Sequence, residues 1–234
     1  INNQSQHWRW HFPDNTHVQH QFPDNLKYIT HVVTSPDSDS IAFIAHSSEN
    51  DFRHIYRMSL ADKHVIQVSK DAGDHFSPSW SNDSKSIYAA TAITGRWEIW
   101  SYPLDGGNPT QITQNGGGII QHHHSQRFIT KADDEGIWQL DNNNKDHLLI
   151  ATLNQEGWGN WSATTNGIYY VERDSLQDYI MLYDYQTQSS SVVAKYTADT
   201  ITEGKNLVFN PHNQTLYFTI NLINDTQVMA VVKN

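Results

Sequence analysis

Histidine side chains are the groups in this sequence that most resemble a reactive or metal-binding set. The 234 residues include 14 His, and three of them are consecutive at His122-His123-His124. In a strand, alternate side chains share a face, so His122 and His124 could together approach one metal ion. A third ligand and groups to orient the rings are not visible in the sequence. We therefore interpret the triplet as packed or hydrogen-bonded strand residues and predict no metal.

A second group of histidines lies near the N-terminus, at His7, His11, His17 and His20. Their spacing is irregular, so we interpret them as structural or exposed residues. Because imidazole titrates near neutral pH, a pH response is a hypothesis for a His-rich protein. It predicts that stability or ligand binding changes between about pH 5.5 and 7.5.

Motifs for covalent catalysis are absent. The sequence has no Cys, which excludes disulfides and thiolate sites, and no Gly-x-Ser-x-Gly motif. Asp133-Asp134-Glu135 precede Gly136, which is typical of a polar turn rather than an acid–base pair. Gly106-Gly107 and Gly116-Gly117-Gly118 do not open a helix, so we expect turns and no phosphate site. The sequence predicts a protein that is not an enzyme and uses no cofactor.

Composition limits the partners of this chain. The net charge is −10, with 15 basic and 25 acidic residues and no basic cluster. Contact with nucleic-acid phosphates or an anionic membrane is therefore disfavoured. Hydrophobic residues make up 37% and aromatic residues 12%, enough for a sizeable core. No apolar run approaches the ~20 residues that span a bilayer, and the polar start Ile1-Asn2-Asn3 lacks Met, which indicates a fragment or a processed product.

The elements that must position these residues recur along the chain. A small turn returns every 39 to 46 residues, at Ser35-Pro36-Asp37, Ser81-Asn82-Asp83, Ser125-Gln126, Thr164-Thr165-Asn166 and Asn210-Pro211-His212. Pro presets φ at such turns, and Asn and Asp bond to their own backbone. A period of about 40–45 residues with four short strands is typical of β-propeller blades.

Runs rich in Val, Ile, Tyr, Phe and Trp predict the strands of each unit. Second strands are expected at 41–45, 87–90, 127–130, 168–171 and 216–220, and third strands at 54–60, 97–104, 136–140, 179–185 and 227–232. Fourth strands are expected at 64–68, 110–113, 147–151 and 191–194. No segment has a helical apolar period. The predicted fold class is therefore all-β, a β-propeller of four-stranded antiparallel blades.

One domain, residues 1–234, is predicted to hold all the blades. Residues 1–29 would form a partial blade and 199–234 a three-stranded blade, with full blades at 30–69, 70–115, 116–153 and 154–198. A ring of six blades is favoured, and a ring of five closed by the two ends is the alternative. Because an open sheet edge invites pairing, we expect N-terminal residues to supply the outer strand of the last blade.

The stretch from Trp97 to Thr113, with Asp105-Gly106-Gly107, resembles the TolB-type, WD-like propeller repeats of bacteria. The order of degenerate units, with Gly116-Gly117-Gly118 followed by a shortened blade, resembles the C-terminal propeller of bacterial CadC/ToxR-like membrane-bound winged-helix transcriptional regulators. In that family, a winged helix binds DNA in the cytoplasm, and one transmembrane helix leads to a periplasmic sensor. The winged helix and the transmembrane segment are absent from this sequence, so DNA binding would belong to a missing N-terminal domain.

The connections between blades would line the mouth of the central tunnel, where propeller ligands commonly approach. On this topology, the candidate ligand-binding residues are Asp74, His75, Gln121, His122, Trp158 and Glu203. The other repeat-related tryptophans are expected to fill the space between blades: Trp80, Trp97, Trp100, Trp138 and Trp161.

The resemblance implies a non-catalytic sensor or interaction propeller, the periplasmic part of an inner-membrane transcriptional regulator. It would bind an unknown small molecule or protein at the tunnel mouth, without itself contacting nucleic acid or membrane. Two alternatives stay open, a TolB-like protein-binding scaffold and a propeller enzyme or peptidase-associated propeller. The sequence upstream of this chain would distinguish them.

Overall fold

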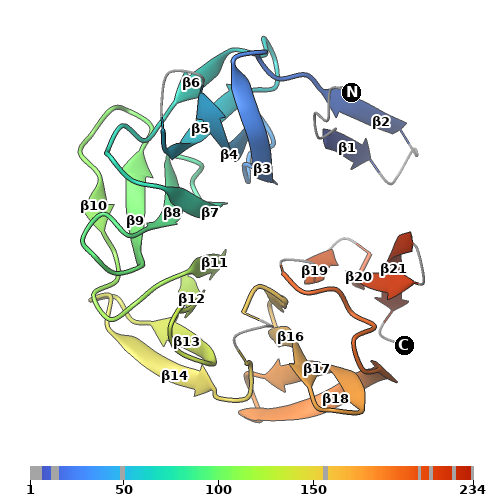
Figure 1. Ribbon diagram of the computed structural model, residues 1–234. Coiled ribbons are helices and arrows are strands. Elements are labelled where there is room, and N and C mark those ends of the chain that lie inside the picture. The colour runs from blue at the N-terminus through green and yellow to red at the C-terminus, as the bar shows by residue number, and fades with distance from the viewer. Residues whose placement is uncertain are drawn as a thin grey trace. The chain divides into compact units, whose positions relative to one another are not determined.

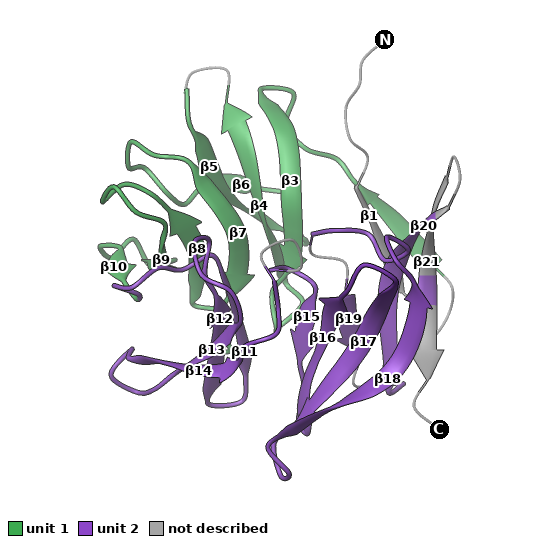
Figure 2. Ribbon diagram, turned by 60° about the horizontal axis from the view of Figure 1, so that its bottom comes forward, with its two compact units in different colours: residues 1–112 green, residues 113–234 purple. Residues whose placement is uncertain are grey.

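The computed structural model describes residues 7–11, 16–47, 51–154, 158–204, 207–210, 213–222 and 225–232. Every regular element in these ranges is a β-strand (Figure 1), and none of them holds a helix that could cross a membrane. The strands pair antiparallel, and four of the sheets have four strands each. The predicted all-β class is thus confirmed. The chain forms two compact units, residues 1–112 and 113–234 (Figure 2), and each is described by itself.

Unit 1 contains three sheets. In the first, β1 (His7–His11) pairs with β2 (Thr16–His20). The second contains β3 (Leu26–Thr34), β4 (Ser40–Ser47), β5 (Arg53–Ser59) and β6 (Val65–Gln67), in that order. The third contains β7 (His75–Trp80), β8 (Ser86–Thr91), β9 (Glu98–Pro103) and β10 (Thr110–Gln111), also in chain order.

The described residues of unit 2 also form three sheets, each with its strands in chain order. Its first sheet contains β11 (Ile119–His123), β12 (Gln126–Thr130), β13 (Ile137–Leu140) and β14 (Asp146–Ile150). Its second contains β15 (Trp161–Ala163), β16 (Gly167–Arg173), β17 (Gln177–Asp184) and β18 (Ser189–Thr197). Its third contains β19 (Leu207–Asn210), β20 (Thr215–Leu222) and β21 (Asp225–Val232).

Hydrogen bonds within the recurring turns explain why the sequence repeats there. The Ser35 hydroxyl donates to Asp37 Oδ1 (2.5 Å) and accepts the amide N–H of Ser40 (3.0 Å). The same pattern returns in the next sheet, where the Ser81 hydroxyl donates to Asp83 Oδ1 (2.6 Å) and accepts the amide N–H of Ser86. These short polar side chains replace backbone partners that a tight turn cannot supply. The predicted first-to-second-strand turns at these two places are confirmed.

Second strands are buried on both faces because the sheets of a unit stack on one another. On β4, Ala42 and Ile44 face a core shared with the next sheet, which includes Trp80. Alternate residues of the same strand, Ile41 and Phe43, face a second core on the other side. Because side chains alternate along a strand, burying both faces requires apolar residues at consecutive positions.

Unit 2 has the same two-faced burial along β16. Ile168 and Tyr170 lie in a core that includes Trp161, whereas Tyr169 and Val171 lie in the core shared with β19 and β20. The expectation that Trp80 and Trp161 fill the space between neighbouring sheets therefore agrees with the structure. Trp100 also packs at the edge of the unit 1 core.

First strands of successive sheets lie next to one another within each unit. In unit 1, the Trp80 indole N–H donates to the Val33 carbonyl of β3 (3.1 Å). In unit 2, the Phe209 amide N–H donates to Ser162 Oγ of β15 (3.1 Å). Such bonds link first strands of neighbouring sheets directly, so these sheets are held together by polar as well as apolar contacts.

The predicted pairing between the N-terminal residues and the last sheet concerns the two ends of the chain. Among the described residues, β1 is paired with β2, and the last sheet has three strands. The expected pairing of N-terminal residues with that sheet is not among the strand pairs of the described ranges. Ring closure, the number of blades and the domain limits therefore stay predictions.

Substitution of Gly167 tests how closely neighbouring strands of one sheet approach each other. A Cβ at this position would lie 2.0 Å from the Tyr183 carbonyl oxygen of β17. We expect Gly167→Ala to lower the free energy of unfolding by about 1–3 kcal/mol, because backbone atoms must move apart. Gly107→Ala is the control, since its nearest contact is the exposed Asp105 carboxylate at 3.2 Å. Urea denaturation should show less than about 1 kcal/mol for the control, and equal losses would contradict this account.

Candidate functional site

The predicted site residues of unit 1 stand where the connection from β6 enters β7. Asp74 ends this connection and is half-exposed, whereas His75 begins β7 and is fully buried. In an antiparallel four-stranded sheet, this connection emerges at the same end as the hairpin between the second and third strands. The hairpin between β4 and β5 therefore shares this end, and Arg53 at the start of β5 reaches the connection.

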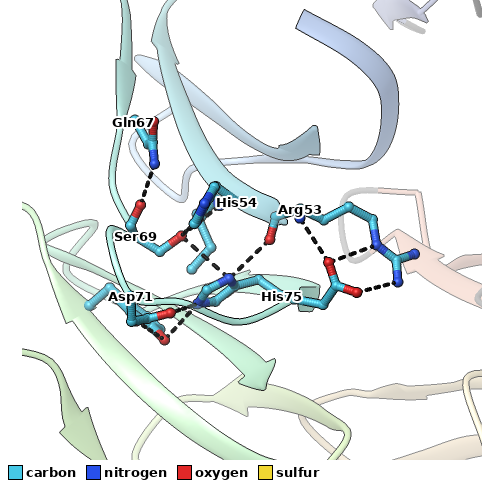
Figure 3. A network of polar contacts seen from close by, with 9 residues as sticks. Arg53, His54, Gln67, Ser69, Asp71 and His75 are labelled. Atoms are coloured by element: carbon cyan, nitrogen blue, oxygen red, sulfur yellow. Dashed lines mark hydrogen bonds and ion pairs between the residues drawn. The ribbon is translucent and has the colours of Figure 1, made fainter. Parts of the chain in front are cut away.

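His75 is held by oxygen atoms at both ring nitrogens (Figure 3). Nδ1 lies 3.0 Å from the Arg53 carbonyl, and Nε2 lies 2.9 Å from Asp71 Oδ1 and 2.9 Å from the Tyr102 hydroxyl. The Tyr102 hydroxyl donates to Asp71 Oδ2 (3.1 Å). A carbonyl oxygen can only accept, so His75 Nδ1 donates to the Arg53 carbonyl, while Nε2 faces the Asp71 carboxylate and the Tyr102 hydroxyl.

The charge state of Asp71 agrees with this pairing. Burial alone would raise the pKa of the Asp71 carboxyl, but the hydrogen bond and charge of His75, with the Tyr102 hydroxyl, lower it on balance. Burial, followed by the negative charge of Asp71, raises the pKa of Tyr102, so this phenol stays protonated and remains a donor. The three side chains therefore form one connected network across β7, β9 and the connection.

Ser69 and His54 extend the network towards β5. Ser69 Oγ accepts the amide N–H of Ile55 (2.9 Å) and lies 3.2 Å from His54 Nδ1. The Ser69 carbonyl accepts from Gln67 Nε2 (2.8 Å; Figure 3). Burial, and then the positive charge of His75, lowers the pKa of His54, which favours its neutral form. A neutral His54 can accept the Ser69 proton at Nδ1.

Ser69, His75 and Asp71 have the residue types of a serine–histidine–aspartate catalytic triad. Their geometry, however, does not support nucleophilic attack by the serine. Ser69 and His75 are both 0% exposed. His75 Nδ1 is 3.5 Å from Ser69 Oγ and is closer to the Arg53 carbonyl, to which it donates. A triad histidine must instead accept the serine proton and leave Oγ open to substrate. This cluster holds the connection in place.

Asp74 is bound to Arg53 by backbone and side chain. Its Oδ1 accepts from the Arg53 amide N–H (2.8 Å) and Nε (3.4 Å), and its Oδ2 accepts from Nη2 (3.1 Å). Burial alone would raise the pKa of Asp74, but the hydrogen bonds and charge of Arg53 lower it on balance. The guanidinium lies 3.7 Å above the Phe76 ring, which contacts Trp97 edge-on at 5.0 Å.

In unit 2, Gln121 joins two first strands. Its Nε2 donates to the Trp161 carbonyl (2.7 Å), and its Oε1 accepts the Ala163 amide N–H (3.0 Å). The half-buried amide thereby continues the hydrogen bonding of β15 across to β11. This use of both ends of the side chain makes Gln121 a structural link in the described structure.

The histidine triplet divides into three environments. His122 is half-buried on β11; burial, and secondarily the charge of Arg127, lowers its pKa to about 4. His123 Nε2 lies 3.2 Å from the Thr165 hydroxyl of the neighbouring sheet. His124 lies outside the strand, exposed in the turn with φ at 51°. The expectation that His122 and His124 share a strand face is therefore wrong, because the strand ends at His123.

Trp158 and Glu203 occupy connections that enter the last two sheets of unit 2. The Trp158 ring packs so closely on Gly118 that a Cβ there would lie 2.9 Å from the ring. Its carbonyl accepts the Trp161 indole N–H (3.1 Å). Glu203 is exposed, with Oε1 3.9 Å from Arg173 Nη1. The Arg173 Nη2 also donates to the Ile201 carbonyl (2.7 Å) in this connection.

Several other predicted groups have structural surroundings. Asp133, Asp134 and Glu135 are exposed in the turn before Gly136, as expected. His17 is exposed and His20 is buried, whereas the side chains of His7 and His11 lie outside those that the structure describes. Within the described ranges, no three His, Asp or Glu side chains gather in a way that could hold a metal ion.

The sequence placed Asp74 and His75 correctly at the end of a connection but missed their partners. Arg53 and Tyr102 come from other strands, 21 and 27 residues away along the chain. One signal was available, since a basic residue stands in or beside the second-to-third-strand hairpin of four sheets: Arg53, Arg96, Lys131 and Arg173. Whether the six predicted residues form one ligand site stays a prediction.

Comparisons with known proteins identify the fold. No protein-family model matches the sequence. The chain is similar to TolB from Acinetobacter baumannii, with a TM-score of 0.71 and 20% identity over 87% of this chain. It spans about half of that protein, 51% of its length.

The chain is also similar to the propeller domain of a protease and to a peptidase. The β-propeller domain of the Trilobed protease from Pyrococcus furiosus has a TM-score of 0.66 and 11% identity, over 98% of this chain and 77% of that one. A Mycobacterium tuberculosis puromycin-hydrolyzing peptidase has a TM-score of 0.63 and 12% identity, over 86% of this chain and 32% of that one. Together with the four-stranded sheets, these similarities show that the chain has a TolB-like β-propeller fold.

His75→Ala tests the buried network. We expect it to lower the free energy of unfolding by about 2–3 kcal/mol, because Asp71 and the Arg53 carbonyl lose a buried donor. His64→Ala, which removes an exposed imidazole from the turn after β5, should change it by less than about 0.5 kcal/mol. The measurement is urea denaturation of both variants at neutral pH. Equal stability of the two variants would refute a structural role for the His75 network.

His122 should make stability depend on pH. Its folded pKa of about 4 lies below the value of about 6.5 for an unfolded histidine. The unfolded chain therefore binds more protons between these values, so the free energy of unfolding falls as the pH falls from about 6.5 towards 4. His122→Gln should flatten this part of the profile, measured by urea denaturation at pH 7, 6 and 5. A constant difference between the wild type and this variant would contradict the account.

Proposed function

We propose that this chain is a non-catalytic interaction propeller that binds its partner at the hairpin end of its sheets. The hairpin end is defined as the end with the connections between sheets and the hairpins between second and third strands. The observation that carries the proposal is an Arg that ties hairpin to connection in each unit. Arg53 binds Asp74 in unit 1, and Arg173 binds the Ile201 carbonyl in unit 2.

These contacts make the hairpin end a firm platform for recognition. Exposed apolar side chains stand on its hairpins, with Phe52 37%, Ile93 36% and Leu176 75% exposed. Arg and aromatic residues on a rigid support are the side chains that most often dominate the energy of protein interfaces. Loops held by a rigid sheet scaffold are also common sites of binding.

A non-catalytic role is supported by the chemistry of the buried cluster. Ser69 and His75 resemble part of a nucleophilic site, yet both are buried and committed to structural hydrogen bonds. The paired acids and bases of this end serve as fixed ion pairs, such as Arg53 with Asp74. Asp74 and His75 in unit 1, and Trp158 and Glu203 in unit 2, lie in or beside connections at this end of their own sheets, whereas His122 lies beside the hairpin between β11 and β12 at the opposite end.

More specifically, we propose that this chain is the periplasmic sensor part of a membrane-anchored transcriptional regulator. The order of degenerate repeat units supports this form through its resemblance to CadC/ToxR-like regulators. The net charge of −10 favours a role away from nucleic acid, so DNA binding would belong to another part of the protein. The same end would then bind a small molecule or a protein and report its presence.

A TolB-like protein-binding scaffold is the second candidate, supported by the likeness to the Acinetobacter baumannii protein. A peptidase-associated propeller is the third, supported by the likeness to the Trilobed protease domain. The gene sequence upstream distinguishes them. A winged helix and one apolar span would support the regulator, whereas a signal peptide alone would exclude it.

Site-specific photo-crosslinking tests the binding end. A benzophenone amino acid placed at Phe52 or Ile93 of unit 1, in the protein produced by its native host, should capture the same partner from both positions. Matched exposed positions at the opposite end of the sheets of unit 1, Asp62 and Asn82, should not capture it. The measurement is mass spectrometry of the cross-linked species. Equal capture from both ends, or capture only from the controls, would overturn the proposal.

A further inference from the structure

An arginine–aromatic surface in unit 1 has the construction of a recognition site. It consists of Arg53, Phe76, Ile93 and Trp97, with Phe52 directly before Arg53. The guanidinium carbon of Arg53 lies 3.7 Å from the centre of the Phe76 ring, and the Trp97 ring meets Phe76 edge-on at 5.0 Å. Two strands, β5 and β7, and two hairpins, β4–β5 and β8–β9, thus contribute to this surface.

The surface is held from below by the connection into β7. Ile93 packs on Gly73 so closely that a Cβ there would lie 2.4 Å from Ile93 Cγ2. The next residue, Asp74, fixes the Arg53 backbone at 2.8 Å and its Nη2 at 3.1 Å. The buried His75 network anchors the following position. An arginine fixed in this way loses little side-chain freedom on binding a partner, which strengthens each contact that it makes.

One edge of the Arg53 guanidinium is available to donate hydrogen bonds to a partner. Asp74 takes the Nε and Nη2 atoms, and within the described part of the chain no hydrogen bond is made by Nη1. The side chain is 34% exposed. A guanidinium has five N–H donors and no acceptor, so the remaining Nη1–Nη2 edge fits an oxygen acceptor and pairs best with a carboxylate.

The charges around Arg53 favour a single carboxylate over a more highly charged anion. Asp74 already balances the Arg53 charge, and the chain as a whole carries −10. A phosphate with about two negative charges would meet this field unfavourably. A carboxylate carries one charge, and the flanking apolar groups, Phe52 at 37% and Ile93 at 36% exposure, can bury its apolar neighbours.

We infer that this surface binds a partner polypeptide segment in which an acidic side chain stands between apolar residues. The carboxylate binds the Nη1–Nη2 edge of Arg53, and the apolar side chains cover Phe76, Trp97 and Ile93 on one side and Phe52 on the other. An internal segment, rather than a chain terminus, can cover both flanks at once. This inference rests on the proposed function and names the chemistry of the partner.

A matched pair of peptides tests the inference by NMR on the whole chain. The probes are Ac-Leu-Glu-Phe-NH2 and its neutral isostere Ac-Leu-Gln-Phe-NH2, with chemical shifts followed at Arg53 Nε–Hε and Trp97 Nε1–Hε1. We expect saturable shifts with the acidic peptide and binding about tenfold weaker with the neutral one, as for loss of a charge-assisted hydrogen bond. A third probe, Ac-Leu-Phe with a free C-terminal carboxylate, should also bind more weakly than the acidic tripeptide.

Variants connect any binding to the proposed residues. Arg53→Gln should make the two tripeptides bind equally, and Phe76→Leu should weaken both. Arg57→Gln is the control, because Arg57 lies on the same strand but bonds Ser40 Oγ at the other end. Intact tryptophan indole signals in each variant will show that the fold is kept.

The outcomes separate the inference from the proposed function. Absence of saturable shifts, equal binding of both tripeptides to the wild type, or loss of preference in Arg57→Gln would overturn the inference. Tighter binding of the free-carboxylate dipeptide would overturn the choice of an internal segment. If the peptides do not bind while cross-linkers at Phe52 and Ile93 still capture a partner, the inferred ligand chemistry is wrong. The proposal that the hairpin end binds a partner is then still supported.

Discussion

Stacking of one sheet on the next is the constraint on which the rest of each unit depends. Second strands such as β4 and β16 supply apolar side chains to a core on each face. A one-residue slip in register would exchange these two sets of side chains, so the stacking also fixes strand pairing. The first strands are thereby brought close enough for bonds such as Trp80 to Val33. A sheet in this arrangement is stable only with its neighbours.

The polar groups of the connections follow from the same stacking. A connection that enters between two packed sheets takes charged residues into a region of low dielectric, where each must be paired. The network of His75, Asp71 and Tyr102 meets that requirement, and the partly exposed pair of Arg53 and Asp74 adds a second contact beside it. Both sets hold the hairpin to the connection. The firm surface that results at this end is what makes binding of a partner the function best supported here.

Local patterns predicted the strands well because both alternation and turn chemistry act between near neighbours. The expected second strand 41–45 lies within β4, and the turn at Ser81 forms as its side chain requires. His124 was misplaced because its backbone leaves the strand at the turn, which three consecutive histidines do not signal. Asp74 and His75 could be placed by their position in a connection, but Arg53 and Tyr102 could not, since only the stacked sheets bring them there.

From the chain alone follow the all-β class, the repeat, the turn residues and the absence of cysteine chemistry. These depend on residue types and on spacing over a few positions. Only the folded packing decides that Ser69 and His75 are buried rather than reactive, that Gln121 links two strands, and that Arg53 rests on Phe76. The reason is physical: burial and partner choice depend on which distant residues the stacked sheets bring within a few ångströms, and no local pattern encodes that distance.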